Sequence, residues 1–155
     1  MTNYQIEQMT AQHLRGVHNV ESSCFAIPWS LDLFEAELAN PAAIYIVAAA
    51  GQEIIGFAGM HHVLDEGHVT NIAVLADYRK QGIGDALLCA LIDISKQLGI
   101  AAITLEVRMG NAAAQRLYGR HGFGFSGIRK NYYFDTKEDA IIMWKYFDKE
   151  GAVTL

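Results

Sequence analysis

Apolar positions along this chain follow two spacings, one typical of strands and one of helices. Runs that are apolar throughout or at every second position predict strands, because successive side chains of a strand point to opposite faces. Turn residues such as Gly51-Gln52, Asp65-Glu66-Gly67 and Thr136-Lys137 separate several of these runs. Strands are predicted over residues 4–7, 44–50, 53–64, 68–74, 102–107, 123–133 and 140–147.

Four helices are predicted between these strands from apolar residues spaced three and four apart. Thr10 and Ser30 can cap the first two, and Asn40-Pro41 ends the second. The third runs from Ile83 to a stop at Gly99, and the fourth starts at Asn111 and ends at 121–122. The residues expected to face inward are Leu14, Val17, Val20, Leu31, Phe34, Leu38, Leu87, Leu91, Ile94 and Leu98.

The order of these elements predicts an α/β (α+β) protein with a mixed sheet covered by helices on both faces. Its 155 residues suit one domain, 1–155, and 52% hydrophobic residues are ample for its core. The N-terminus has no signal-peptide pattern and no apolar run is long enough to span a membrane, so we expect a cytoplasmic protein without a membrane partner. The cysteines, Cys24 and Cys89, are expected to be reduced thiols.

Charge narrows the classes of partner. The formal net charge is −5, which argues against direct nucleic-acid binding, because such binding needs a basic surface. The same charge mildly favours a basic partner.

The stretch 79–84, Arg-Lys-Gln-Gly-Ile-Gly, lies between the apolar run ending at Val74 and the helix beginning at Ile83. Its glycines let the backbone approach a ligand closely, and the N–H groups of the helix that follows favour an anion. It matches neither the dinucleotide fingerprint nor the Walker loop. The stretch therefore predicts a pyrophosphate site, with a merely glycine-rich helix start as the alternative.

The same stretch resembles the R/Q-x-x-G-x-G/A pyrophosphate loop of the GNAT superfamily of acetyl-CoA-dependent N-acetyltransferases. Further segments resemble its RimI branch, whose members acetylate the N-terminal alanine of a small-subunit ribosomal protein. Departures from that pattern are Ala76 and Met109-Gly110. The segments that carry the resemblance are 24–30, 67–74, 105–108, 111–114, 117–118, 122–123 and 131–133.

The resemblance implies the GNAT fold, in which the sheet is mostly antiparallel, and acetyl-CoA as co-substrate. The backbone of Ile72, Ala73 and Val74 would pair with the pantetheine amides like an added strand, and Asn111 would hold the pantetheine arm. Arg79 and Lys80 would add positive charge to the loop, with solvated loop charge as the alternative. The loop residues assigned to the cofactor are Arg79, Lys80, Gln81, Gly82, Ile83, Gly84 and Asp85.

Acetyl transfer from a thioester requires a neutral amine and a protonated leaving thiolate. Glu106 lies on a strand whose Ile103, Leu105 and Val107 face one way, so its carboxylate lies on the other face and can act as general base, directly or through water. The alternative is an ordinary surface glutamate paired to Arg108.

Tyr118 lies two helical turns after Asn111 on the same face. The superfamily's catalytic tyrosine falls at this position, so the resemblance assigns to it proton donation to the thiolate. A tyrosine packed in the core is the alternative. Neither cysteine has an activating neighbour, so direct attack in a ternary complex is favoured over an acetyl-cysteine route.

Four aromatic residues, Phe25, Trp29, Tyr132 and Tyr133, are assigned to a groove for an extended peptide, with core packing as the alternative and the favoured one for Trp29. No metal site is expected, because His61 and His62 point to opposite faces and lack further ligands at metal spacing. His68 stays open as another base.

These observations predict an enzyme that acetylates the N-terminal α-amine of a protein, alanine first, with a basic ribosomal protein as the expected partner. Two alternatives remain open at this stage. One is a small-amine or antibiotic N-acetyltransferase, and the other is a CoA-sensing module without catalysis.

Overall fold

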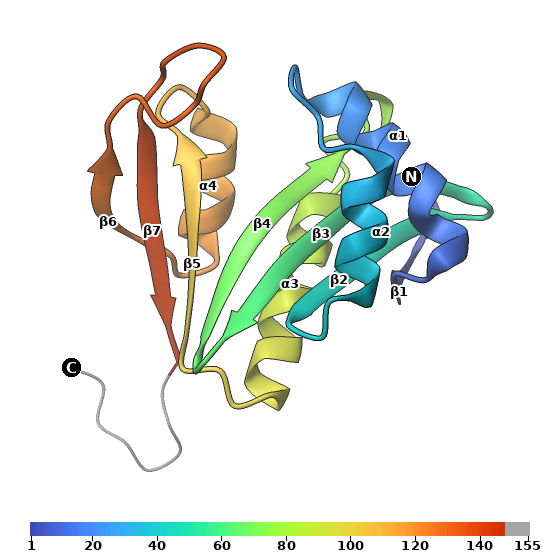
Figure 1. The fold of residues 1–155 in the computed structure, drawn as a ribbon, viewed down its shortest axis with the longest axis horizontal. Coiled ribbons are helices and arrows are strands. Elements are labelled where there is room, and N and C mark those ends of the chain that lie inside the picture. The colour runs from blue at the N-terminus through green and yellow to red at the C-terminus, as the bar shows by residue number, and fades with distance from the viewer. Residues whose placement is uncertain (148–155) are drawn as a thin grey trace. The chain divides into compact units, whose positions relative to one another are not determined.

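The computed structural model describes residues 1–147, and residues 148–155 of the predicted domain lie outside the described part. Figure 1 shows the order of the elements along the chain. The strands are β1 (Gln5–Gln8), β2 (Ala43–Ala50), β3 (Glu53–Val63), β4 (Glu66–Val74), β5 (Ala102–Arg108), β6 (Gly124–Arg129) and β7 (Ala140–Tyr146). The α-helices are α1 (Leu14–Cys24), α2 (Leu31–Ala39), α3 (Ile83–Gln97) and α4 (Ala112–Arg120), and the short 3₁₀ helices are η1 (Ala11–His13) and η2 (Ala76–Tyr78).

The sheet is mixed and mostly antiparallel, as the sequence predicts, with strand order β1-β2-β3-β4-β5-β7-β6. Neighbouring strands β1 and β2, β2 and β3, β5 and β7, and β6 and β7 run antiparallel. The parallel pair is β4 with β5, where Glu66 to His68 align with Ala102 to Thr104.

Two compact units make up the chain. Unit 1 comprises Met1–His61 and Thr70–Ile92, and unit 2 comprises His62–Val69 and Asp93–Leu155. The single domain 1–155 stays a prediction.

The core of unit 1 is built around Phe34 of α2. The ring centroid of Phe34 lies 5.5 Å from that of Phe57 and 5.6 Å from that of Trp29. Val17 and Val20 of α1 belong to the same buried cluster, so α1 and α2 cover the face of β3 that carries Phe57. Gly56 belongs to the opposite face, where an added Cβ would lie 3.3 Å from Leu87 of α3. Helices thus lie on both faces of this part of the sheet, as Figure 1 shows for α2 and α3.

Helix starts agree closely with the sequence. The Oγ of Ser30 accepts a hydrogen bond from the Leu33 N–H at 3.2 Å, and the Oδ1 of Asn111 accepts one from the Ala114 N–H at 3.1 Å. These caps satisfy N–H groups that the first turn of a helix leaves unpaired. Thr10 instead precedes the 3₁₀ turn η1, so α1 begins later than its predicted cap implies.

Two residues expected in the core are exposed. Leu38 is 38% exposed and Leu98 is 49% exposed. Leu38 lies in the last turn of the nine-residue α2, whose buried residue is Phe34. Leu98 follows the last residue of α3, and Gly99, with φ of +72°, redirects the chain there.

The turn expected over 65–67 is also displaced. Leu64 adopts the left-handed conformation, with φ of +56°, whereas Glu66 and Gly67 already belong to β4. The turn therefore lies earlier, at Leu64 and Asp65, and β4 is longer than the sequence indicates.

The closing hairpin differs most from its prediction. Strand β6 ends at Arg129 rather than at Tyr133, and residues 130–139 form a loop. Asn131 has a φ of +53° and its N–H donates to the Asp139 side chain at 2.8 Å, so the strand cannot continue through it. We refer to residues 130–139 as the β6–β7 loop.

No α-helix within residues 1–147 combines the length and the low polarity that crossing a bilayer requires.

The contact between Gly59 and Tyr45 gives a test of this packing. A Cβ at Gly59 would lie 2.2 Å from the ring of Tyr45, whose hydroxyl is held by Glu37 and Thr70. Because the ring cannot easily move, Gly59→Ala should lower the free energy of unfolding by about 1–3 kcal/mol. The matched control is Gly119→Ala in α4, where a Cβ meets nothing within 4 Å, and it should raise stability by up to about 1 kcal/mol. Urea denaturation followed by circular dichroism measures both, and an unchanged Gly59→Ala midpoint contradicts the packing described.

Candidate active site

The glycine loop of unit 1 has an open backbone. Lys80 and Gly82 both have left-handed conformations, with φ of +63° and +80°. A Cβ at Gly82 would meet no atom within 4 Å, and α3 begins immediately afterwards at Ile83. The first N–H groups of a helix have no carbonyl in a preceding turn, so they favour an anion there. These features fit the predicted pyrophosphate site.

Arg79, the first residue of the motif, makes contacts within unit 1. Its Nε donates to the carbonyl oxygen of Val74 at 2.9 Å, and its guanidinium contacts the Cys24 sulfur at 3.5 Å. Gln81 likewise accepts a hydrogen bond from the N–H of Thr2 at 3.0 Å. Arg79 therefore ties the loop to the end of β4, a role that the sequence did not indicate, while Lys80 is exposed.

The predicted pantetheine strand, Ile72 to Val74, is the last part of β4. The Leu75 N–H donates to the Ile55 carbonyl of β3, and the carbonyl oxygen of Ala73 lies toward Gly56 of β3. Because the backbone N–H and C=O groups of a strand alternate in direction, those of Ile72 and Val74 point away from β3, to the other edge of β4. One group at that edge already has a partner, because the Val74 carbonyl accepts a hydrogen bond from Arg79.

Glu106 of unit 2 lies on the face of β5 opposite the buried residues Ile103, Leu105 and Val107. Its side chain is 27% exposed, and its Oε1 lies 3.3 Å from the Nε of Arg129 in β6. Arg108, the partner that the alternative interpretation gave to Glu106, pairs with Asp135 and Glu138 of the β6–β7 loop.

Tyr118 of α4 is 8% exposed, and its ring packs edge-on against Phe123 with 5.9 Å between centroids. Burial raises the pKa of its hydroxyl to about 12. The phenol therefore carries its proton at neutral pH, as a proton donor must. Core packing and proton donation, posed as alternatives by the sequence, are compatible in this position.

Tyr133 is a second tyrosine of unit 2 with a raised pKa. Burial raises the pKa of Tyr133 to about 12, and the positive charge of Arg108 opposes this rise. The Tyr133 ring lies 4.0 Å from the Cζ of Arg108, which follows Glu106 by two residues on the same face of β5. Unit 2 thus carries the carboxylate of Glu106 on β5, the buried phenol of Tyr118 on α4 and the phenol of Tyr133 in the β6–β7 loop.

Asn111 caps α4 through its Oδ1, so that its Nδ2 is the part of the amide left to hold the pantetheine arm. The cofactor role of Asn111 therefore stays a prediction, with a structural role beside it.

The four aromatic residues assigned to peptide binding divide between the units. Phe25 and Trp29 are half-buried and pack against the core of unit 1, which supports the packing alternative for both. Tyr132 is 48% exposed and meets Tyr133 edge-on at 5.1 Å. Their role in substrate binding stays a prediction.

Sequence reasoning missed Glu21, a carboxylate that is only 2% exposed. It accepts hydrogen bonds from the Trp29 N–H at 2.9 Å and the Asn71 Nδ2 at 2.8 Å. Burial raises the pKa of its carboxyl, and the two hydrogen bonds offset only part of this effect. The sequence feature that could have indicated this burial is the position of Glu21 on the apolar face of α1, beside Val17 and Val20.

His61 and His68 both have carboxylate partners. His61 pairs with Glu37, and the Nε2 of His68 lies 2.9 Å from the Oε1 of Glu66. Residues 1–147 contain no group of three side chains suited to hold a metal ion. His68 as an alternative base stays a prediction.

Comparison with known proteins identifies the class. Residues 14–123 match the Acetyltransferase (GNAT) family, and the chain belongs to this family. It is an acetyl-CoA-dependent N-acetyltransferase, with acetyl-CoA as co-substrate.

Particular relatives narrow the class further. The ribosomal protein bS18-alanine N-acetyltransferase of Escherichia coli K12 is 40% identical over 140 residues, which cover 89% of this chain and 94% of the relative. Its Haemophilus ducreyi counterpart is 36% identical over 146 residues, covering 91% and 99%. The crystal structure of the ribosomal-protein-S18-alanine N-acetyltransferase from Escherichia coli superposes with a TM-score of 0.87 at 36% identity, covering 98% of this chain and 100% of that one.

The buried carboxyl of Glu21 predicts a specific pH dependence of stability. Because its pKa in the folded state is raised above the ordinary value of 4.5, Glu21 stabilises the fold most when protonated. That contribution is complete below a pH of about 4.5 and is lost as the pH rises through the folded-state pKa. The free energy of unfolding of wild type, relative to Glu21→Gln, should therefore fall as pH rises from about 4.5 to 7.5.

Denaturation of both proteins at several pH values measures this difference. Glu35→Gln, the same change at an exposed position of α2, is the control. A difference between wild type and Glu21→Gln that is constant with pH contradicts the raised pKa.

Proposed function

We propose that this enzyme acetylates the N-terminal α-amine of a protein that begins with alanine, a small-subunit ribosomal protein, in the cytoplasm. The observation that carries the proposal is the alignment of the chain, along nearly its whole length, with bS18-alanine N-acetyltransferases. In unit 2 this chain has a partly exposed carboxylate, Glu106, and a buried phenol, Tyr118, at the positions assigned to the base and the acid. Direct attack of the amine on the acetyl group is the proposed route.

Glu106 is the proposed proton acceptor. The reactive amine must lose a proton as its nitrogen bonds to the acetyl carbon, and the partly exposed carboxylate of Glu106 can take that proton directly or through a water molecule. Arg129 occupies one of its oxygens, but the Arg129 side chain is 54% exposed and can turn toward solvent at little cost.

Tyr118 is the proposed proton donor to the departing sulfur. Acetyl-CoA, when bound, supplies the acetyl thioester. Tyr118 is protonated at neutral pH, as an ordinary tyrosine is, and burial raises its pKa further, to about 12. In unit 1 the glycine loop would bind the pyrophosphate with backbone N–H groups and Lys80, and the edge of β4 at Ile72 would bind the pantetheine amides.

An N-terminal α-amine is a better acceptor than a lysine side chain for an enzyme whose proposed base is Glu106. The pKa of an N-terminal amine is about 7.8 and that of lysine about 10.4, a difference of roughly 3.5 kcal/mol in deprotonation. A single, partly exposed carboxylate can more readily deprotonate the α-amine, because less free energy is needed to remove its proton. The net charge of −5 also favours a basic partner such as a ribosomal protein over an acidic one.

Peptide acetylation tests the function. A synthetic peptide that begins with alanine and carries the N-terminal sequence of the organism's own ribosomal protein bS18 should gain one acetyl group from acetyl-CoA. The same peptide with a blocked N-terminus and an internal lysine should not. Mass spectrometry with fragmentation locates the group. Acetylation of lysine, or turnover of polyamines or aminoglycosides in place of the peptide, overturns the α-amine assignment.

Substitution tests the two proton-transfer roles. Glu106→Gln and Tyr118→Phe remove the acceptor and the donor while keeping the shape of each side chain, so each should lower kcat by roughly 10²–10⁴ and leave acetyl-CoA affinity nearly unchanged. Glu35→Gln and Tyr146→Phe make the same chemical changes at exposed positions and serve as controls. Steady-state kinetics and calorimetric acetyl-CoA titration measure both effects, and wild-type turnover by either variant removes that residue from the mechanism.

A further inference from the structure

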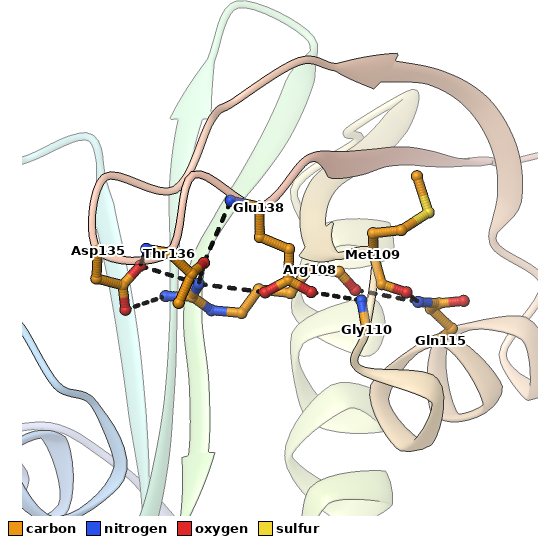
Figure 2. Close-up of polar contacts among 7 residues, drawn as sticks. All are labelled: Arg108, Met109, Gly110, Gln115, Asp135, Thr136 and Glu138. Carbon is orange, nitrogen blue, oxygen red and sulfur yellow. Dashed lines mark hydrogen bonds and ion pairs between the residues drawn. The ribbon is translucent and has the colours of Figure 1, made fainter.

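Arg108, the last residue of β5, contacts several residues of the β6–β7 loop. Figure 2 shows its guanidinium between Asp135, Thr136 and Glu138. Its two terminal nitrogens donate to the two Asp135 oxygens, each at 3.1 Å, and one of them also donates to the Thr136 hydroxyl at 3.2 Å and pairs with Glu138 at 3.5 Å.

The same guanidinium packs over an aromatic ring of the loop. The Cζ of Arg108 lies 4.0 Å from the centre of the Tyr133 ring, which is a cation–π contact. A planar, forked donor is needed to bind a carboxylate through two parallel hydrogen bonds and to stack on a ring at once, and only arginine offers both.

Glu138 extends this contact to the start of α4. Its second oxygen accepts the Gly110 N–H at 2.6 Å, and a Cβ at Gly110 would lie 2.7 Å from that oxygen. The backbone carbonyl of Arg108 also accepts from the Asn111 N–H and from the Gln115 side chain, each at 3.0 Å. The β6–β7 loop and the beginning of α4 are therefore fixed to the same residue.

We propose that Arg108 is a positioning residue that holds the β6–β7 loop, with Tyr132 and Tyr133, in the conformation that binds the acceptor amine. This inference rests on the proposed function. Arg108 acts through the loop rather than on the reacting atoms, so it sets the KM of the acceptor and leaves the affinity for acetyl-CoA to other residues. Its specific geometry, not its charge alone, is what the loop requires.

Two variants separate geometry from charge. Arg108→Lys keeps the positive charge but cannot make the forked contact, and Asp135→Asn removes the paired carboxylate. Each should raise the KM of the acceptor by roughly tenfold or more with kcat changed far less, the pattern of lost binding rather than lost chemistry. Both substitutions remove the same Arg108–Asp135 contact. The KM of the double variant should therefore be little higher than that of either single variant. Arg116→Lys, the same change at an exposed position of α4, is the matched control.

Hydrogen exchange gives a readout that needs no acceptor. Amides of residues 131–137 should exchange on the order of tenfold faster in Arg108→Lys than in wild type, while amides of β1 and β2 keep their rates. Wild-type exchange and wild-type KM in Arg108→Lys overturn the proposal, because a lysine would then suffice. Faster exchange with unchanged KM also overturns it, because the loop would then not bind the acceptor.

The proposed function fails in a different way. If wild type does not turn over the alanine peptide, the same KM comparison is made with whichever amine it does acetylate. A rise in that KM on Arg108→Lys supports the role of Arg108 although the peptide assignment is lost, and an unchanged KM overturns both.

Discussion

The alternation of side chains along β5 is the constraint on which the arrangement of unit 2 depends. Ile103, Leu105 and Val107 are almost fully buried, and this burial leaves one permitted register. A slip of one residue would bury Glu106 and Arg108 and expose the three apolar side chains, at a cost of several kcal/mol for the buried charges alone. The buried face of β5 thus determines on which side of the strand Glu106, the proposed base, and Arg108, which holds the β6–β7 loop, lie.

Those parts of the fold that depend on local chemistry could be predicted from the sequence. The caps Ser30 and Asn111 and the helix start at Ile83 each follow from hydrogen bonds or backbone conformations within a few residues, and the structure has them where the pattern indicates. The strands of the sheet follow from alternation in the same way. The end of the strand after Phe123 could not be predicted, because it depends on tertiary contacts of the β6–β7 loop. The Asn131 N–H donates to the Asp139 side chain, and Arg108, distant in sequence, binds Asp135.

The candidate site also has features that follow from local sequence patterns and features that depend on tertiary contacts. The position of Glu106 follows from period-two alternation, but its ion pair with Arg129 and the contact of Arg79 with Cys24 depend on residues distant in sequence. Glu21 was visible as a charge on an apolar helix face, yet its partners, the Trp29 N–H and Asn71, come from separate segments. A residue type in a pattern therefore indicates what a side chain can do, whereas the tertiary contacts decide which of its capacities are already used.

Burial of Tyr118 changes the energetics of the proposed acid step. A phenol with a pKa near 12 is a weaker acid than free tyrosine, and transfer of its proton to a thiolate of ordinary pKa, about 8.5, is uphill by about 5 kcal/mol. The cost falls to about 2 kcal/mol, the ordinary difference between the two groups, if the sulfur departs into equally apolar surroundings, because desolvation destabilises the thiolate as well as the phenolate. In the proposed mechanism Tyr118 therefore protonates a buried leaving group more readily than one in water. The environment that weakens the acid also makes the proton transfer selective for a sulfur held out of solvent.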